Sequence, residues 1–125
     1  QYKSGYHDYW KTGIFPTDAN YSYQVEGIGE DFLATIMKNN IDLVDDIVLV
    51  DDPSAFKTSL ELLSKEGIFS GGSAGANIFA SLKVAKKLYK KKKKGTIVTI
   101  IPDSGRSYMS KFYNPEWRKS QGFNF

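Results

Sequence analysis

The chain has 125 residues, of which 41% are hydrophobic, 25% charged and 14% aromatic, and these proportions exclude a disordered tail or a collagen-like repeat. No apolar run approaches the roughly 18 residues of a membrane-spanning helix, and the lack of cysteine excludes disulfides, thiolate metal sites and a cysteine nucleophile. The net charge is only +3, and without the seven lysines between Lys86 and Lys94 the chain is net acidic.

The N-terminal part carries weak signals for secondary structure. The sequence predicts one short helix that ends near Gly13, and a weak strand over residues 21–25 that leads into Gly27 and Gly29. These two glycines do not form a G-x-G-x-x-G dinucleotide fingerprint, because Phe32 stands three positions after Gly29.

Two amphipathic helices are predicted in the second half. The first begins at the acidic pair before Pro53 and ends at Gly67, with apolar residues spaced three and four apart. The second begins around Ala74 and continues through Tyr89, again with one apolar face.

Strands are predicted on either side of these helices. Residues 47–50 form a β-branched run, residues 68–69 a short apolar step, and residues 96–101 the strongest strand of the chain. Strand and helix alternate, which predicts an α/β fold of parallel strands with right-handed helical crossovers.

The lysine run follows the second helix and precedes Gly95. Its favoured interpretation is a solvated helix end, where cations offset the negative end of the macrodipole. Binding of a polyanion remains the alternative.

Residues 68–76 form a glycine-rich turn from a short strand into a helix, where free N–H groups and the helix dipole favour an anion or a polar ring atom. A plain strand–helix turn with Ser73 as the N-cap is the alternative. The turn also matches the G-x-S-x-G pattern of serine hydrolases, but those need a histidine after the serine, and the sole histidine, His7, precedes it.

Residues 102–108 follow the strongest strand directly. Ligands of open α/β sheets bind at the carboxyl ends of strands, so Pro102 and Asp103 are candidate site residues, with an ordinary Pro-Asp-Ser-Gly turn as the alternative.

Three segments in order carry a family resemblance: Y-x-V-E-G-I-G-E-D-F at 23–32, E-G-I-F-x-G-G-S-A-G-A at 66–76 and P-D-S-G-R-S-Y-M-S-K at 102–111. Together they resemble the C-terminal part of the cystathionine β-synthase and cysteine synthase family, whose members are pyridoxal-phosphate (PLP) enzymes of fold type II. Glu26 and residues 108–111 are more similar to the cystathionine β-synthase branch.

This resemblance implies an α/β fold: a portion of the three-layer, parallel-sheet large domain of the tryptophan-synthase-β-like PLP fold, with residues 1–125 as its C-terminal portion. It implies a lyase of sulfur amino-acid metabolism that catalyses β-replacement on serine or O-acetylserine by homocysteine. A cysteine synthase that uses sulfide, and a degenerate, non-catalytic paralogue that binds a partner, are the alternatives.

The resemblance also implies roles for single residues. Ser73 would bond the pyridine nitrogen of PLP, with Gly72, Pro102 and Asp103 beside the cofactor. A neutral hydroxyl there leaves the nitrogen unprotonated and makes the ring a moderate electron sink. The loop of Gly27, Ile28 and Gly29 would line the substrate side.

The family's Schiff-base lysine, substrate-carboxylate loop and phosphate cradle lie upstream of the matched segments. We therefore expect this chain to be a fragment that is inactive alone and that needs the upstream half of the enzyme. We expect amino-acid substrates, a homodimer for the complete enzyme, a cytoplasmic location, and neither nucleic acid nor membrane as a partner.

Overall fold

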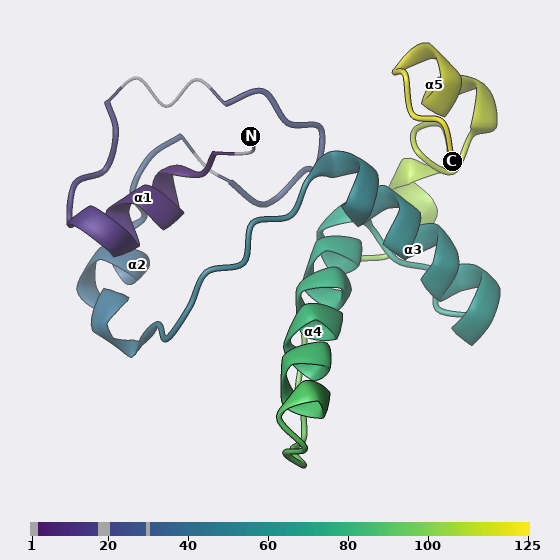
Figure 1. The fold of residues 1–125 in the computed structure, drawn as a ribbon. Coiled ribbons are helices and arrows are strands. Elements are labelled where there is room, and N and C mark those ends of the chain that lie inside the picture. Colours follow the sequence, from purple (N-terminus) through teal and green to yellow (C-terminus); the bar gives the residue numbers. More distant parts are fainter. Residues whose placement is uncertain (1–2, 18–20, 30) are drawn as a thin grey trace. The chain divides into compact units, whose positions relative to one another are not determined.

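The computed structural model describes residues 3–17, 21–29 and 31–125. The chain divides into two compact units, Gln1–Leu49 and Val50–Phe125 (Figure 1). None of the described helices is long and apolar enough to cross a membrane.

The first unit contains α1 (Gly5–Thr12), α2 (Thr35–Asn39) and the short 3-10 helix η1 (Ile41–Leu43). The predicted helix end near Gly13 is confirmed, because Gly13 adopts the left-handed φ of 73° that closes α1. Polar contacts between distant parts of the chain hold the unit together. The Trp10 indole N–H donates to the carbonyl of Val44 at 2.9 Å, and the Tyr6 hydroxyl accepts from the backbone N–H of Ala34 at 3.3 Å.

The second unit is built on α3 (Asp52–Glu66) and α4 (Gly72–Lys90), which pack against each other. The limits predicted for α3 are confirmed: the Asp51 carboxylate caps it by accepting from the Ser54 N–H at 2.7 Å, and Gly67 closes it with a φ of 71°. The second predicted helix is also confirmed, but it begins at Gly72 rather than around Ala74.

Aromatic side chains fill the core between α3 and the C-terminal segment, which holds η2 (Gly105–Tyr108) and α5 (Pro115–Ser120). Phe56 stacks on Phe112 with ring centroids 4.6 Å apart, and Trp117 and Phe123 meet Phe56 edge-on. This cluster fixes the C-terminal segment against α3.

The main difference from the sequence-based expectation concerns the predicted parallel sheet, which the described part of the chain does not form. Residues 21–25, 47–50, 68–69 and 96–101 form no strands within the described part of the chain, where the β pairing is an isolated antiparallel bridge between Ser70 and Ser104. Segment 96–101 instead returns along α4, where the carbonyl of Ile100 accepts from the Asn77 side-chain amide at 2.9 Å (Figure 1). A strand needs a neighbouring strand for its hydrogen bonds, and these segments do not supply one to each other.

Candidate functional site

The turn that enters α4 is held by hydrogen bonds from two sides. The N–H of Gly71 donates to the carbonyl of Asp103 at 3.2 Å, and the Ser59 hydroxyl of α3 donates to the carbonyl of Gly71 at 2.9 Å. Residues 70–76 are all buried. The position of the α4 N-terminus is therefore fixed by α3 and by the turn at 103–104.

Asp103 is oriented by a tyrosine of the same turn. The Tyr108 hydroxyl donates to the Asp103 carboxylate at 2.6 Å, and the Ser104 hydroxyl caps η2 by accepting from the Arg106 N–H. A Cβ atom on Gly71 would collide with the Asp103 carboxylate and would come within 2.8 Å of the Tyr108 ring. Glycine is required at position 71 because the two turns approach so closely.

Tyr113 also holds the turn that enters α4, from the C-terminal segment. Its hydroxyl donates to the carbonyl of Ser70 at 2.7 Å, and its ring packs edge-on against Phe69. Burial raises the pKa of Tyr113, because removal from water disfavours the charged phenolate. The Ser70 hydroxyl is itself fully buried and has no partner of good geometry in the described part of the chain.

The raised pKa predicts how stability depends on pH. Folding favours the neutral phenol. The contribution of Tyr113 to the free energy of unfolding is therefore complete below pH 10, and it is lost as the pH rises through the folded-state pKa. Tyr113→Phe should lower the free energy of unfolding at pH 8 by about 1 kcal/mol, because Ser70 loses a donor. In urea unfolding, this difference should shrink at pH 11. A difference that stays constant with pH would contradict the assignment.

Ser73 lies in the first turn of α4 and is only 4% exposed. It is not the N-cap, so that alternative is wrong: Gly71 occupies the cap position, and no side chain caps the helix. Ser73 therefore places a hydroxyl, which can donate or accept, beside the positive end of a 19-residue helix.

The structure brings together only some of the predicted site residues. Gly72 and Ser73 begin α4, and Asp103 lies beside Gly71, the residue that precedes them. Pro102 directly precedes Asp103 in the same unit. The predicted substrate loop, Gly27-Ile28-Gly29, belongs to the first unit.

That loop has a conformation that requires its glycines. Gly27 and Gly29 both adopt a φ of +79°, which side chains disfavour. A Cβ on Gly29 would also press on the ring of Tyr23, 2.8 Å away. Ile28 between them is 37% exposed, so the loop presents an apolar side chain at its surface.

The sequence analysis missed three residues that hold the entrance to α4: Ser59, Ser70 and Tyr113. The sequence could have indicated the role of Ser59, because a serine within the apolar stripe of α3 is buried and buried hydroxyl groups form hydrogen bonds. No local pattern indicates the role of Tyr113, because its partner, Ser70, lies 43 positions away in the sequence.

Comparison with known proteins identifies relatives of this chain, although no family model matches it. It is 37% identical over 101 residues to a cystathionine β-synthase of Apis mellifera, covering 81% of this chain and 19% of that protein. A cystathionine β-synthase of Saccharomyces cerevisiae is 39% identical over 97 residues, covering 78% of this chain and 19% of that protein.

A solved structure shows the same relationship. The crystal structure of a cysteine synthase from Entamoeba histolytica matches with a TM-score of 0.68 and 32% identity, over 88% of this chain and 30% of that one. The chain spans about a fifth of the length of the curated relatives it matches. Sequence and fold together show that the chain is similar to one segment of cystathionine β-synthases and cysteine synthases.

Proposed function

We propose that this chain forms the C-terminal portion of the large domain of a PLP-dependent enzyme that catalyses β-replacement on serine or O-acetylserine. The observation that carries the proposal is the buried hydroxyl of Ser73 at the entrance to α4, held in place through Ser59, Asp103 and Tyr113. Homocysteine as the sulfur acceptor is supported by the curated relatives, which are named cystathionine β-synthases.

The residues at this entrance fit the pyridine end of the cofactor. A neutral hydroxyl and the free N–H groups of a helix N-terminus are donors suited to an uncharged ring nitrogen. The fully buried hydroxyl of Ser70 lies just before the N-cap and adds a second polar group to the same turn. When bound, PLP supplies an electron sink for the amino-acid substrate.

The residues of this chain would orient the ring and tune its nitrogen. Ser73 would hydrogen-bond to the nitrogen without placing a proton on it, since a serine hydroxyl does not ionise in the neutral pH range. The hydrogen bond from Tyr108 to Asp103, and the bond from Gly71 N–H to Asp103, would keep the turn at 102–104 against the entrance to α4. Under the same proposal, the Gly27–Gly29 loop faces the substrate, and the upstream half of a homodimeric, cytoplasmic enzyme provides the lysine and the phosphate cradle.

The test substitutes Ser73 in a longer protein that includes the upstream half. Ser73→Asp should reduce turnover by about 100-fold or more, because an aspartate favours the protonated nitrogen and changes the electron sink. It should also shift the absorption spectrum of the bound cofactor. Ser73→Ala should retain the cofactor and lose about tenfold in turnover.

Ser81→Ala is the matched control, because Ser81 lies on the same helix more than two turns away. We expect it to behave as the parent protein in both measurements. If both Ser73 variants show the parent spectrum and turnover, Ser73 does not contact the ring.

A further inference from the structure

Residues 69–71, which lead into α4, are held through three backbone carbonyls in a row. Each carbonyl accepts a hydrogen bond from a different place in the second unit: Phe69 from the Gly105 N–H at 3.2 Å, Ser70 from the Tyr113 hydroxyl at 2.7 Å, and Gly71 from the Ser59 hydroxyl at 2.9 Å. The donors belong to η2, to the turn before α5 and to α3. A shift of residues 69–71 would therefore strain at least one of these bonds.

The ring of Tyr113 is fixed separately from its hydroxyl. The ring packs edge-on against Phe69, with centroids 4.7 Å apart, and its centroid lies 4.5 Å from that of Phe112. Phe112 is 1% exposed and stacks on Phe56 of α3. A phenylalanine at position 113 could make the same ring contacts, so these contacts do not need the hydroxyl. What the hydroxyl adds is the bond to the carbonyl of Ser70.

The bond from Tyr113 to Ser70 acts on the backbone three residues before Ser73. Gly71, between the two serines, is the N-cap of α4, and its carbonyl accepts the first helical hydrogen bond, from the N–H of Gly75 at 3.3 Å. A displacement of Ser70 and the N-cap is therefore carried into the first turn, which holds Ser73. Hydrogen bonds of a hydroxyl group require a narrow range of distances, about 2.5–3.0 Å for O–H donors to oxygen. Even a small shift of the first turn would thus weaken a bond made by the Ser73 hydroxyl.

We propose that Tyr113 is a positioning residue for the cofactor: its hydroxyl, bonded to the Ser70 carbonyl, sets the Ser73 hydroxyl at the distance needed to bond the ring nitrogen of PLP. This inference rests on the proposed function, in which Ser73 contacts that nitrogen. It adds a residue that lies after the last of the three motifs, at 102–111. The C-terminal segment thereby takes part in orienting the ring, through the backbone of residues 70–73.

A tyrosine that only stabilises the fold and a tyrosine that positions Ser73 have different effects on cofactor binding. A loss of stability weakens the binding of every ligand of the site alike. A displaced Ser73 hydroxyl weakens only those ligands that accept its hydrogen bond. The deaza analogue of PLP, in which a C–H group replaces the ring nitrogen, cannot accept that bond. Comparison of PLP with this analogue therefore isolates the contact that Tyr113 is proposed to set.

The test titrates the cofactor-free longer protein, which includes the upstream half, with PLP and with the deaza analogue. Tyr113→Phe should raise the dissociation constant of PLP about threefold, in proportion to one weakened hydrogen bond, and should leave that of the analogue unchanged. Ser73→Ala should show the same selectivity with a larger effect. Because both changes act on one contact, the double variant should bind PLP no more weakly than Ser73→Ala alone.

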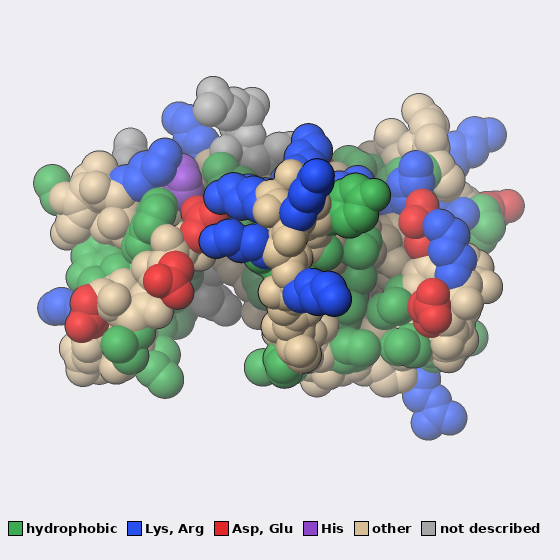
Figure 2. Space-filling model, turned by 60° about the horizontal axis from the view of Figure 1, so that its bottom comes forward, with side chains coloured by type: hydrophobic (Ala, Val, Ile, Leu, Met, Phe, Trp, Pro, Cys, Tyr) green, Lys and Arg blue, Asp and Glu red, His purple; other side chains and the backbone are tan. Residues whose placement is uncertain are grey.

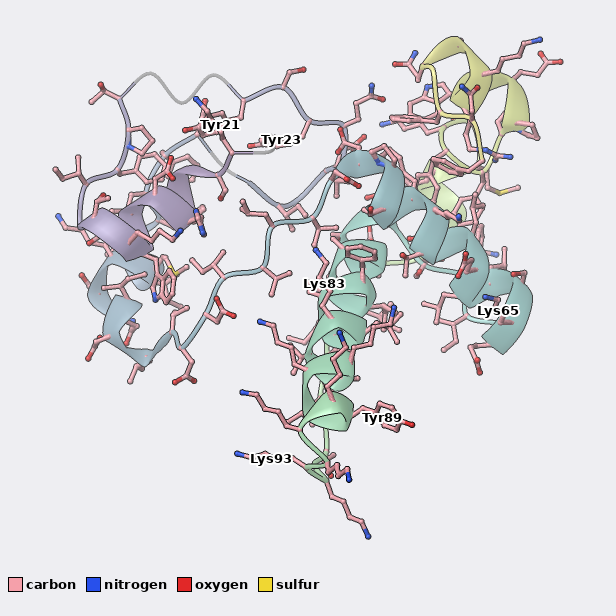
Figure 3. The ribbon with its side chains drawn as sticks, viewed as in Figure 1. Tyr21, Tyr23, Lys65, Lys83, Tyr89 and Lys93 are labelled. Carbon is pink, nitrogen blue, oxygen red and sulfur yellow. The ribbon has the colours of Figure 1, made fainter. Side chains whose placement is uncertain are left out.

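Tyr89→Phe is the matched control, because it removes the same hydroxyl group at the other end of α4. Figure 2 shows lysine side chains gathered around this end of the helix, and the side chains of Lys90–Lys94 are all exposed. Tyr89 is itself 85% exposed, and Figure 3 shows it at the end of α4 that is farther from α3. We expect Tyr89→Phe to bind both cofactors as the parent protein does.

The outcomes separate this inference from the proposed function. Equal weakening of PLP and of the analogue by Tyr113→Phe would reduce its role to stability and would overturn the inference. Parent affinity of Tyr113→Phe for both cofactors would also overturn it, and the proposed function would stand if Ser73→Ala still discriminates between them. If Ser73→Ala does not discriminate, the proposed contact of Ser73 with the nitrogen fails, and the positioning role of Tyr113 fails with it.

Discussion

Substituting alanine for Gly75 is expected to lower the free energy of unfolding of the second unit by about 3 kcal/mol. A Cβ atom at position 75 would collide with the carbonyl oxygen of Ala55 and with the Ser59 hydroxyl. The first of these is backbone of α3, which cannot rotate away, so the two helices must separate. The Ser59 hydroxyl would also lose its geometry toward the carbonyl of Gly71, and the entrance to α4 would loosen.

Gly95→Ala provides the matched control for this substitution. A Cβ there would lie 3.5 Å from the Leu88 side chain, which is ordinary van der Waals contact. We expect a change below about 0.5 kcal/mol. Urea unfolding can be followed by the fluorescence of Trp117, which packs on Phe56, in a Trp10→Phe background. An unchanged midpoint for Gly75→Ala would show that α3 and α4 do not pack as closely as described.

Local signals in the sequence predicted the helices well. The limits of α3 are decided within a few residues by Asp51, Pro53 and Gly67, so they could be read from the chain directly. The start of α4 was placed two residues late, because Gly71 and Gly72 are poor helix formers on their own. Here Gly71 is the extended N-cap residue and Gly72 the first helical one, and the contacts of Gly71 with Asp103 and Ser59 fix this start.

The predicted strands failed for a physical reason that the sequence pattern cannot express. A β-branched run such as residues 96–101 indicates a preference for extended structure, but the hydrogen bonds of a strand come from another segment. The two predicted motifs that hold Ser73 and Asp103 lie side by side in the second unit, where the N–H of Gly71 donates to the carbonyl of Asp103. The attachment through Tyr113 could not be predicted, because it depends on how the C-terminal segment folds back onto Ser70.

Segment 96–101, which forms no strand in the described part of the chain, leads to the second large expected effect, which is self-association of the chain in isolation. Val98 is 88% and Ile100 70% exposed, in a run that favours strand geometry. An exposed apolar segment with free backbone groups pairs with any available strand. By sedimentation velocity, the weight-average mass should rise well above 14.1 kDa as the protein concentration increases. Val98→Lys with Ile100→Lys should keep the chain monomeric.

A second pair of exposed apolar residues serves as the control that distinguishes strand pairing from nonspecific hydrophobic association. Ile36 and Leu43 are 77% and 74% exposed, and they lie on short helices of the first unit. If segment 96–101 associates as a strand, lysine at both of these positions should leave the concentration dependence of the mass unchanged. Equal suppression by the two double variants would instead assign the association to exposed apolar area alone. A parent chain that stays at monomer mass at every concentration would show that the returning segment is already satisfied by its contacts with α4, and that it needs no strand from the remainder of the proposed enzyme.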